Sequence, residues 1–146
     1  MSVEAERQFV DTNILVYAHD AAAGEKHHKA RQLLVDLWQS RLGCVSVQVL
    51  QEFYLTVTRE VANPLKSEEA AAIIRDLSTW RVHSPQADDI LAAIALQTRY
   101  QLSFWDAMIL HSANALACEL LWTEDLHHGQ RVNATLIRNP FQNTPE

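Results

Sequence analysis

The sequence has few residues that break or cross-link a chain: 3 glycines, 4 prolines and 2 cysteines among 146 residues. This shortage of chain-breaking residues predicts mostly regular structure, rich in helix. The cysteines, Cys44 and Cys118, are far apart in the sequence and form no CxxC motif. A disulfide framework and a zinc ribbon are therefore not expected, and a reducing, cytoplasmic setting is favoured.

Long apolar runs are also lacking. No segment approaches the ~20 apolar residues that a membrane-spanning helix needs, and the start of the sequence lacks the charge and apolar stretch of a signal peptide. We therefore expect no membrane association.

The formal net charge of −6 argues against a protein that coats nucleic acid electrostatically. It is compatible with an enzyme that binds phosphates through a metal ion, or with a basic protein partner.

The length and composition predict one globular domain covering residues 1–146, because 48% of the residues are hydrophobic and 21% are charged. Short apolar segments predict strands, and the segments between them have the periodicity of helices. The strand segments are 8–10, 44–47, 81–83, 119–122 and 136–138. Strands that alternate with helices predict a three-layer α/β/α fold, with a central parallel sheet of about four to five strands.

Two serines are predicted to begin helices. Ser84, with Pro85 after it, has the pattern of an N-cap followed by a first helical residue, in a helix that runs to about Tyr100. Ser103 is predicted to cap a further helix, which runs to about Ala117.

Four acidic residues are candidates for an active site, and three of them lie at or just beyond strand ends or helix starts, on the rim where a parallel α/β sheet usually forms its site. Asp11 follows the first strand, and Glu52 lies in the helix after the second. Asp106 lies at the start of a largely apolar helix. Asp125 follows the fourth strand, where Glu124 is a rival for the same role. Each acid has a structural alternative, as a helix cap, a turn residue or a solvated helix residue.

The four acids are more informative together than singly. Converging carboxylates repel one another unless something compensates their charge. Mg²⁺ supplies that compensation, since it prefers oxygen ligands. A bound divalent ion also lowers the pKa of water and neutralises the charge that develops on a phosphate, which suits phosphodiester hydrolysis. The pattern therefore predicts a metal-dependent nuclease with these acids as catalytic residues.

Four segments, in this order, resemble the PIN-domain family, and most closely the VapC-type toxins of bacterial toxin–antitoxin pairs. They are FVDTNILVYA (9–18), VQVLQEFY (47–54), LSFWDAMIL (102–110) and LWTEDLHHGQRVN (121–133), with Asn139-Pro140-Phe141 following. Together they span nearly the whole chain. The resemblance implies a parallel sheet packed between helices, a homodimer, and inhibition by a separate antitoxin.

The resemblance also implies roles for individual residues. The implied ligands of Mg²⁺ or Mn²⁺ are Asp11, Glu52, Asp106 and Asp125, and the implied supporting residues are Thr12, Asn13 and Thr123. The leading hypothesis is an endoribonuclease that cleaves RNA and is the toxin of a type II toxin–antitoxin pair, with a cognate antitoxin as its partner.

Two other functions stay open. A non-catalytic PIN-like module would bind RNA or protein with the same fold. A phosphotransfer domain would use Asp11 as its phosphate acceptor, although Asn13 stands where a haloacid dehalogenase-type phosphatase has a second aspartate. A zinc site is not expected, because the adjacent histidine pairs lack the spacing of metal ligands. His83 and His111 are predicted to be structural or packing residues.

Overall fold

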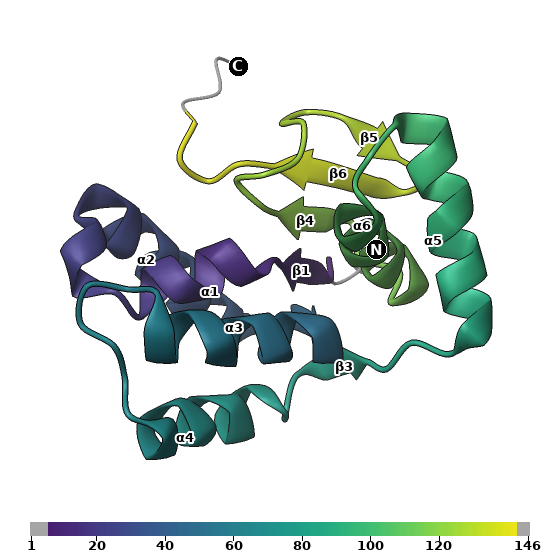
Figure 1. Ribbon diagram of the computed structural model, residues 1–146. Helices are drawn as coiled ribbons and strands as arrows, with labels where there is room; N and C mark the ends of the chain where they lie inside the picture. Colours follow the sequence, from purple (N-terminus) through teal and green to yellow (C-terminus); the bar gives the residue numbers. More distant parts are fainter. Residues whose placement is uncertain (1–5, 143–146) are drawn as a thin grey trace.

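Six short strands form one sheet in the computed structural model, which describes residues 6–142 (Figure 1). The strands are β1 (Gln8–Val10), β2 (Gly43–Ser46), β3 (Arg81–His83), β4 (Leu120–Trp122), β5 (Arg131–Val132) and β6 (Thr135–Arg138). Their order across the sheet is β3-β2-β1-β4-β6-β5. All neighbouring strands are parallel except β5 and β6, whose arrows point in opposite directions in Figure 1.

Helices connect the parallel strands and surround the sheet (Figure 1). They are α1 (Thr12–Ala18), α2 (Glu25–Ser40), α3 (Val47–Arg59), α4 (Ser67–Leu77), α5 (Ala87–Tyr100) and α6 (Phe104–Ala115), with a short 3-10 helix η1 (Ala21–Ala23). α1 packs against α2 and α3, α3 against α4, and α5 against α6. Within residues 6–142, every helix is too short or too polar to span a lipid bilayer.

Apolar side chains from the sheet and the helices share one large core. The central strands contribute Phe9, Val10 and Leu121, all fully buried. A strand that is covered on both faces has a continuous apolar run instead of an alternating pattern. β4 has this composition, and so do Phe9 and Val10 of β1, which explains why such short strands could be predicted from the sequence. Cys44 and Cys118 are free thiols, both buried in this core.

The centre of the sheet determines where a site can form. β1 pairs in parallel with β4, and Val10 lies opposite Trp122. The next residues, Asp11 and Thr123, therefore leave the same edge of the sheet side by side. The chain continues from β1 to β2 on one side, whereas β4 lies on the other. Open α/β sheets form a crevice at such a point, where the strand order reverses.

The predicted α/β fold is confirmed, but the sheet has six strands instead of the expected four to five. The missed strand is β5, which has only two residues. It forms because the chain turns at Asn133, in the left-handed conformation with φ of 54°, and pairs back onto β6. A strand of two residues is too short to have a periodic pattern of its own.

The predicted cap at Ser103 is confirmed, because its hydroxyl accepts a hydrogen bond from the amide of Asp106 at 3.1 Å. The predicted start of α5 is wrong. Gln86, and not Ser84, is the N-cap of this helix. The Asp89 carboxylate accepts the amide hydrogen of Gln86 at 2.8 Å, and this capping interaction sets the helix start two residues later than the Ser84-Pro85 pattern indicated.

Candidate active site

Asp11 connects β1 to α1 and is almost completely buried, with 4% of its surface exposed. As the N-cap of α1, it accepts a hydrogen bond from the amide of Thr12 at 2.7 Å through Oδ1. Its other oxygen, Oδ2, accepts the hydroxyl hydrogen of Thr123 at 2.8 Å. The structural and functional interpretations of Asp11 therefore coexist: the side chain caps a helix and also lies at the crevice beyond β1 and β4.

Burial makes the negative charge on Asp11 unfavourable. Desolvation raises the pKa of Asp11 to about 7, although the hydrogen bonds from Thr123 and Thr12 oppose this effect. The nearby carboxylates of Asp125 and Glu52 raise the pKa further. A buried carboxyl group with such neighbours is a site where a cation would be stabilising.

Glu52 reaches the same region from α3. One carboxylate oxygen accepts the hydroxyl hydrogen of Thr12 at 2.8 Å, and the other accepts a hydrogen from the amide nitrogen of Gln48 at 3.3 Å. The Gln48 amide nitrogen also donates to the backbone oxygen of Trp105 at 3.3 Å. Gln48 thus links α3 to the start of α6 and orients Glu52 from one helical turn away.

Gln48 is a site residue that the sequence analysis missed. Its side-chain oxygen is buried and has no hydrogen-bond partner within the described residues. The signal available in the sequence was the four-residue spacing from Glu52, which puts both side chains on one face of α3. That spacing is common in helices, so it became informative only once the position of Glu52 was known.

Asp106 enters the site from the first turn of α6. Burial raises the pKa of Asp106, the hydrogen bond with Ser103 opposes the shift, and the charges of Asp125 and Glu52 reinforce it. The same two acids therefore act electrostatically on both Asp11 and Asp106. This shared interaction indicates that the four acids, from four separate stretches of chain, lie near one another.

Asp125 and Glu124 are neighbours in sequence but point to different partners. Asp125 accepts a hydrogen bond from the side-chain amide of Asn13 at 2.9 Å. The Glu124 carboxylate instead accepts the hydroxyl hydrogen of Tyr17 at 2.7 Å and forms an ion pair with Lys26. Between these rivals, Asp125 is the acid whose charge acts on Asp11, whereas Glu124 is already neutralised by a lysine.

The four acids lack basic partners within residues 6–142, where the ion pairs are those of Lys26 with Glu124 and of two histidines with Asp89. Their donor atoms are all oxygens, which fits a hard cation such as Mg²⁺ or Mn²⁺. Among the described residues, no three of them bring oxygens within 4.8 Å of one another. Mg²⁺ tolerates this spread, since it usually keeps several waters and takes only one or two carboxylates directly.

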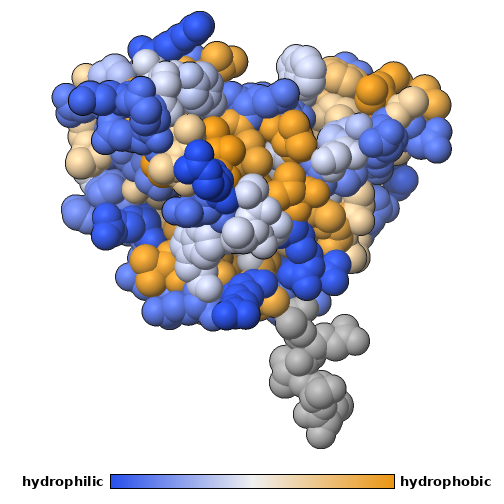
Figure 2. Space-filling model, turned by 90° about the horizontal axis from the view of Figure 1, so that it is seen from below, coloured by the Kyte–Doolittle hydropathy of each residue, from blue (hydrophilic) through white to orange (hydrophobic). Residues whose placement is uncertain are grey.

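An apolar groove opens beside Glu52 between α3, α4 and the start of α6. It has a volume of about 780 Å³ and is lined by Val47, Gln48, Leu50, Gln51, Glu52, Tyr54, Leu55, Ile74 and Trp105. Trp105 is 60% exposed although it is a large aromatic residue. Figure 2, which views the molecule from the side of α4 in Figure 1, also shows hydrophobic surface across the middle of that face. Such exposed apolar surface is typical of a binding region.

Comparisons with known proteins agree with this architecture. A family model described as the PIN domain matches residues 9–132. The chain is similar to the structure of VapC20 from Mycobacterium tuberculosis, which is described as a sarcin-ricin loop cleaving toxin. The two share 24% sequence identity with a TM-score of 0.61, and the match covers 78% of this chain and 86% of that chain. No curated relative matches the chain.

Two further similar structures come from toxin–antitoxin complexes. One, from Klebsiella pneumoniae, has 22% identity and a TM-score of 0.66, and the match covers 93% of this chain and 99% of that chain. The other is VapBC2 from Rickettsia felis, bound to a DNA fragment from its promoter, with 20% identity, a TM-score of 0.63, and coverage of 90% and 97%. At these identities the likeness establishes a shared fold.

Proposed function

Because this chain belongs to the PIN-domain family, we propose that it is a metal-dependent endoribonuclease and the toxin of a type II toxin–antitoxin pair. The main support is the convergence of Asp11, Glu52, Asp106 and Asp125 at the strand-order reversal of the sheet, with no basic side chain of residues 6–142 to neutralise them. Asp11 is buried, and Glu52 and Asp106 are half-buried. Carboxylates in such positions without a counter-charge either take up a proton or are stabilised by a bound cation.

We propose that Asp11 and Asp106 hold Mg²⁺ or Mn²⁺ directly. When bound, the ion would neutralise the carboxylates and stabilise negative charge on the phosphate. Glu52, oriented by Thr12 and Gln48, would bind the ion or accept a proton from the water that attacks phosphorus. Cleavage in line would leave a 5′-phosphate and a 3′-hydroxyl.

The remaining residues would hold these groups in place. Thr123 donates to Asp11, and Asn13 donates to Asp125, so each of these carboxylates has a fixed orientation. Trp105, exposed at the edge of the apolar groove, would stack on an unpaired base, as aromatic residues commonly do in single-stranded RNA recognition.

Metal removal tests this proposal directly. We expect the protein to cleave total RNA with Mn²⁺ or Mg²⁺ present, and to lose that activity on addition of EDTA, because the acids alone would repel the phosphate. The measurement is the appearance of fragments with 5′-phosphate ends, with a DNA of the same sequence as the comparison substrate. RNA binding without cleavage under all metal conditions would favour the non-catalytic module instead.

Asp125 and Glu124 offer a matched pair of substitutions. We expect Asp125→Asn to lower the cleavage rate by about 10-fold or more, because the negative charge of Asp125 acts on both Asp11 and Asp106, the proposed metal ligands. Glu124→Gln removes the same charge one residue away, yet should leave the metal dependence unchanged, since Glu124 is paired with Lys26. Cleavage rates measured across a Mn²⁺ titration compare the two, and equal losses would contradict the assignment of Asp125.

The partner proposal rests on the similar structures and on the surface. Two of the similar structures are toxin–antitoxin complexes, and the chain has an exposed apolar groove next to its acidic site. We propose that a cognate antitoxin covers this region and that the chain forms a homodimer. The net charge of −6 suits a partner segment that carries basic residues.

A further inference from the structure

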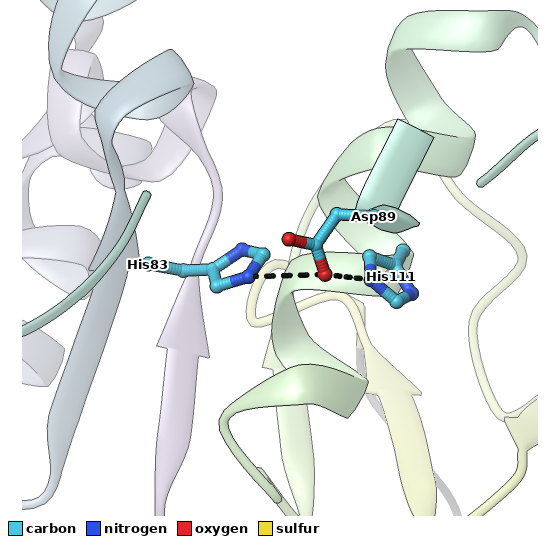
Figure 3. A group of neighbouring side chains, drawn as sticks. All are labelled: His83, Asp89 and His111. Carbon is cyan, nitrogen blue, oxygen red and sulfur yellow. Dashed lines mark hydrogen bonds and ion pairs between the residues drawn. The ribbon is translucent and has the colours of Figure 1, made fainter. Parts of the chain in front are cut away.

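A second cluster of metal-ligating side chains lies away from the four acids. His83 at the end of β3, Asp89 in the first turn of α5 and His111 in α6 meet with their ligand atoms all within 4.8 Å of one another. Figure 3 shows the Asp89 carboxylate between the two imidazole rings, with one oxygen facing both. That oxygen, Oδ1, lies 3.5 Å from Nε2 of His83 and 2.7 Å from Nε2 of His111.

From this convergence we infer that His83, Asp89 and His111 form a site for a divalent transition-metal ion, with Zn²⁺ as the ion that the donors favour. Two imidazole nitrogens and one carboxylate oxygen are donors that bind Zn²⁺ well, whereas Mg²⁺ prefers oxygen donors alone. A water molecule would be the fourth ligand, as in zinc sites that have three protein ligands.

The distances suit such an ion after small movements. In a tetrahedral site with metal–ligand bonds of about 2.0–2.2 Å, ligand atoms lie about 3.4 Å apart. The 3.5 Å separation between His83 and Asp89 already has this value, and the 2.7 Å contact between His111 and Asp89 must open by less than 1 Å. The side chains are 12%, 22% and 15% exposed for His83, Asp89 and His111, so an ion can reach them while most of each group is fixed by packing.

Neighbouring residues orient the proposed ligands. The second nitrogen of His83, Nδ1, is 2.8 Å from the hydroxyl oxygen of the buried Ser112, so Nε2 is the nitrogen that faces the site. The second oxygen of Asp89 accepts the amide hydrogen of Gln86 and leaves Oδ1 for the histidines. Partners of this kind, which fix the unused atom of a ligand, accompany most histidine and carboxylate metal ligands.

The cluster is distinct from the candidate active site even though both use α6. Asp106 and His111 are five residues apart, which places them about 140° apart around the helix and about 7.5 Å apart along it. An ion bound by His83, Asp89 and His111 would join the edge strand β3 to α5 and α6. By joining these three elements, the bound ion would stabilise this corner of the fold. This role does not depend on nuclease activity.

Zinc binding to the untagged full chain tests the site, with Zn²⁺ measured by competition with a chromophoric chelator. We expect one Zn²⁺ per chain, and affinity at least about 100-fold weaker in His111→Gln and Asp89→Asn. His28→Gln is the matched control, since His28 is an exposed histidine on α2, and it should bind as tightly as the wild type. Asp11→Asn should also retain Zn²⁺, which separates this site from the proposed nuclease site.

Two further measurements keep the test decisive. Bound Co²⁺ should give the intense visible absorption of a four-coordinate ion, and His111→Gln should lose it. Zn²⁺ should raise the thermal midpoint of the wild type but not of His111→Gln. If circular dichroism shows that His111→Gln or Asp89→Asn has not folded, His83→Gln replaces it in these measurements, because His83 lies on a different element. Zn²⁺ binding that is equal in the wild type and in folded cluster variants would overturn the proposal, and so would loss of binding in Asp11→Asn.

Discussion

Replacing Asp11 by asparagine is expected to reduce RNA cleavage by at least about 100-fold while making the metal-free protein more stable. The loss follows from the proposed role, because an amide is a much weaker ligand than a carboxylate for a hard cation. The gain follows from burial: Asp11 is 4% exposed, and a neutral amide avoids the desolvation of a charged group.

The asparagine side chain preserves the shape of the carboxylate and one of its two accepted hydrogen bonds. Its carbonyl oxygen can still accept the hydrogen that the Thr12 amide or the Thr123 hydroxyl now donates to Asp11. Asparagine is also as good an N-cap as aspartate, so α1 should begin at the same residue. The combination of lost activity and raised stability distinguishes a functional carboxylate from one that is retained for folding.

The measurements are cleavage of total RNA with Mn²⁺ and chemical unfolding in the presence of EDTA. Asp36→Asn is the matched control, since it removes one negative charge from an exposed position on α2, and it should change neither quantity appreciably. If Asp11→Asn cleaved RNA at the wild-type rate, Asp11 would not belong to the catalytic machinery and the nuclease proposal would fail.

The fold was predictable because its central strands have unambiguous sequences. β4 is apolar throughout and β1 is apolar after Gln8, and each strand is followed at once by polar residues, which marks the edge of the sheet. The predicted PIN-domain resemblance is confirmed by the family match. The position of Asp11 beyond β1 was accordingly foreseeable from the chain alone, and the pairing of Val10 with Trp122 explains why residues 112 positions apart in sequence share a hydrogen bond.

Other features depend on tertiary contacts that no local pattern encodes. The choice between Asp125 and Glu124 required the positions of Asn13 and Lys26, which select one acid for the crevice and neutralise the other. The prediction that His83 and His111 are structural residues considered each histidine separately. Only the tertiary fold brings His83 of β3 and His111 of α6 beside Asp89 of α5. Gln48 was missed for a similar reason, since its role depends on where Glu52 points.

Raising the pH is expected to destabilise the metal-free protein through Asp11. The pKa of Asp11 in the folded protein is about 7, against 3.8 for the unperturbed group. Between these values the folded chain retains a proton that the unfolded chain has released, so the free energy of unfolding falls as pH rises through this range. Asparagine cannot titrate. The stability of the wild type relative to Asp11→Asn should therefore fall by about 3 kcal/mol between pH 5 and pH 8.

Chemical unfolding of both proteins at the two pH values, with EDTA, measures this difference and cancels the contributions of the other titrating groups. Mn²⁺ should restore wild-type stability at pH 8 more than at pH 5, because the ion binds the deprotonated carboxylate and competes with the proton. The same addition should change the stability of Asp11→Asn much less. A difference between wild type and variant that does not vary with pH would mean that Asp11 is ionised throughout this range, and a cation would then not be needed to stabilise its charge.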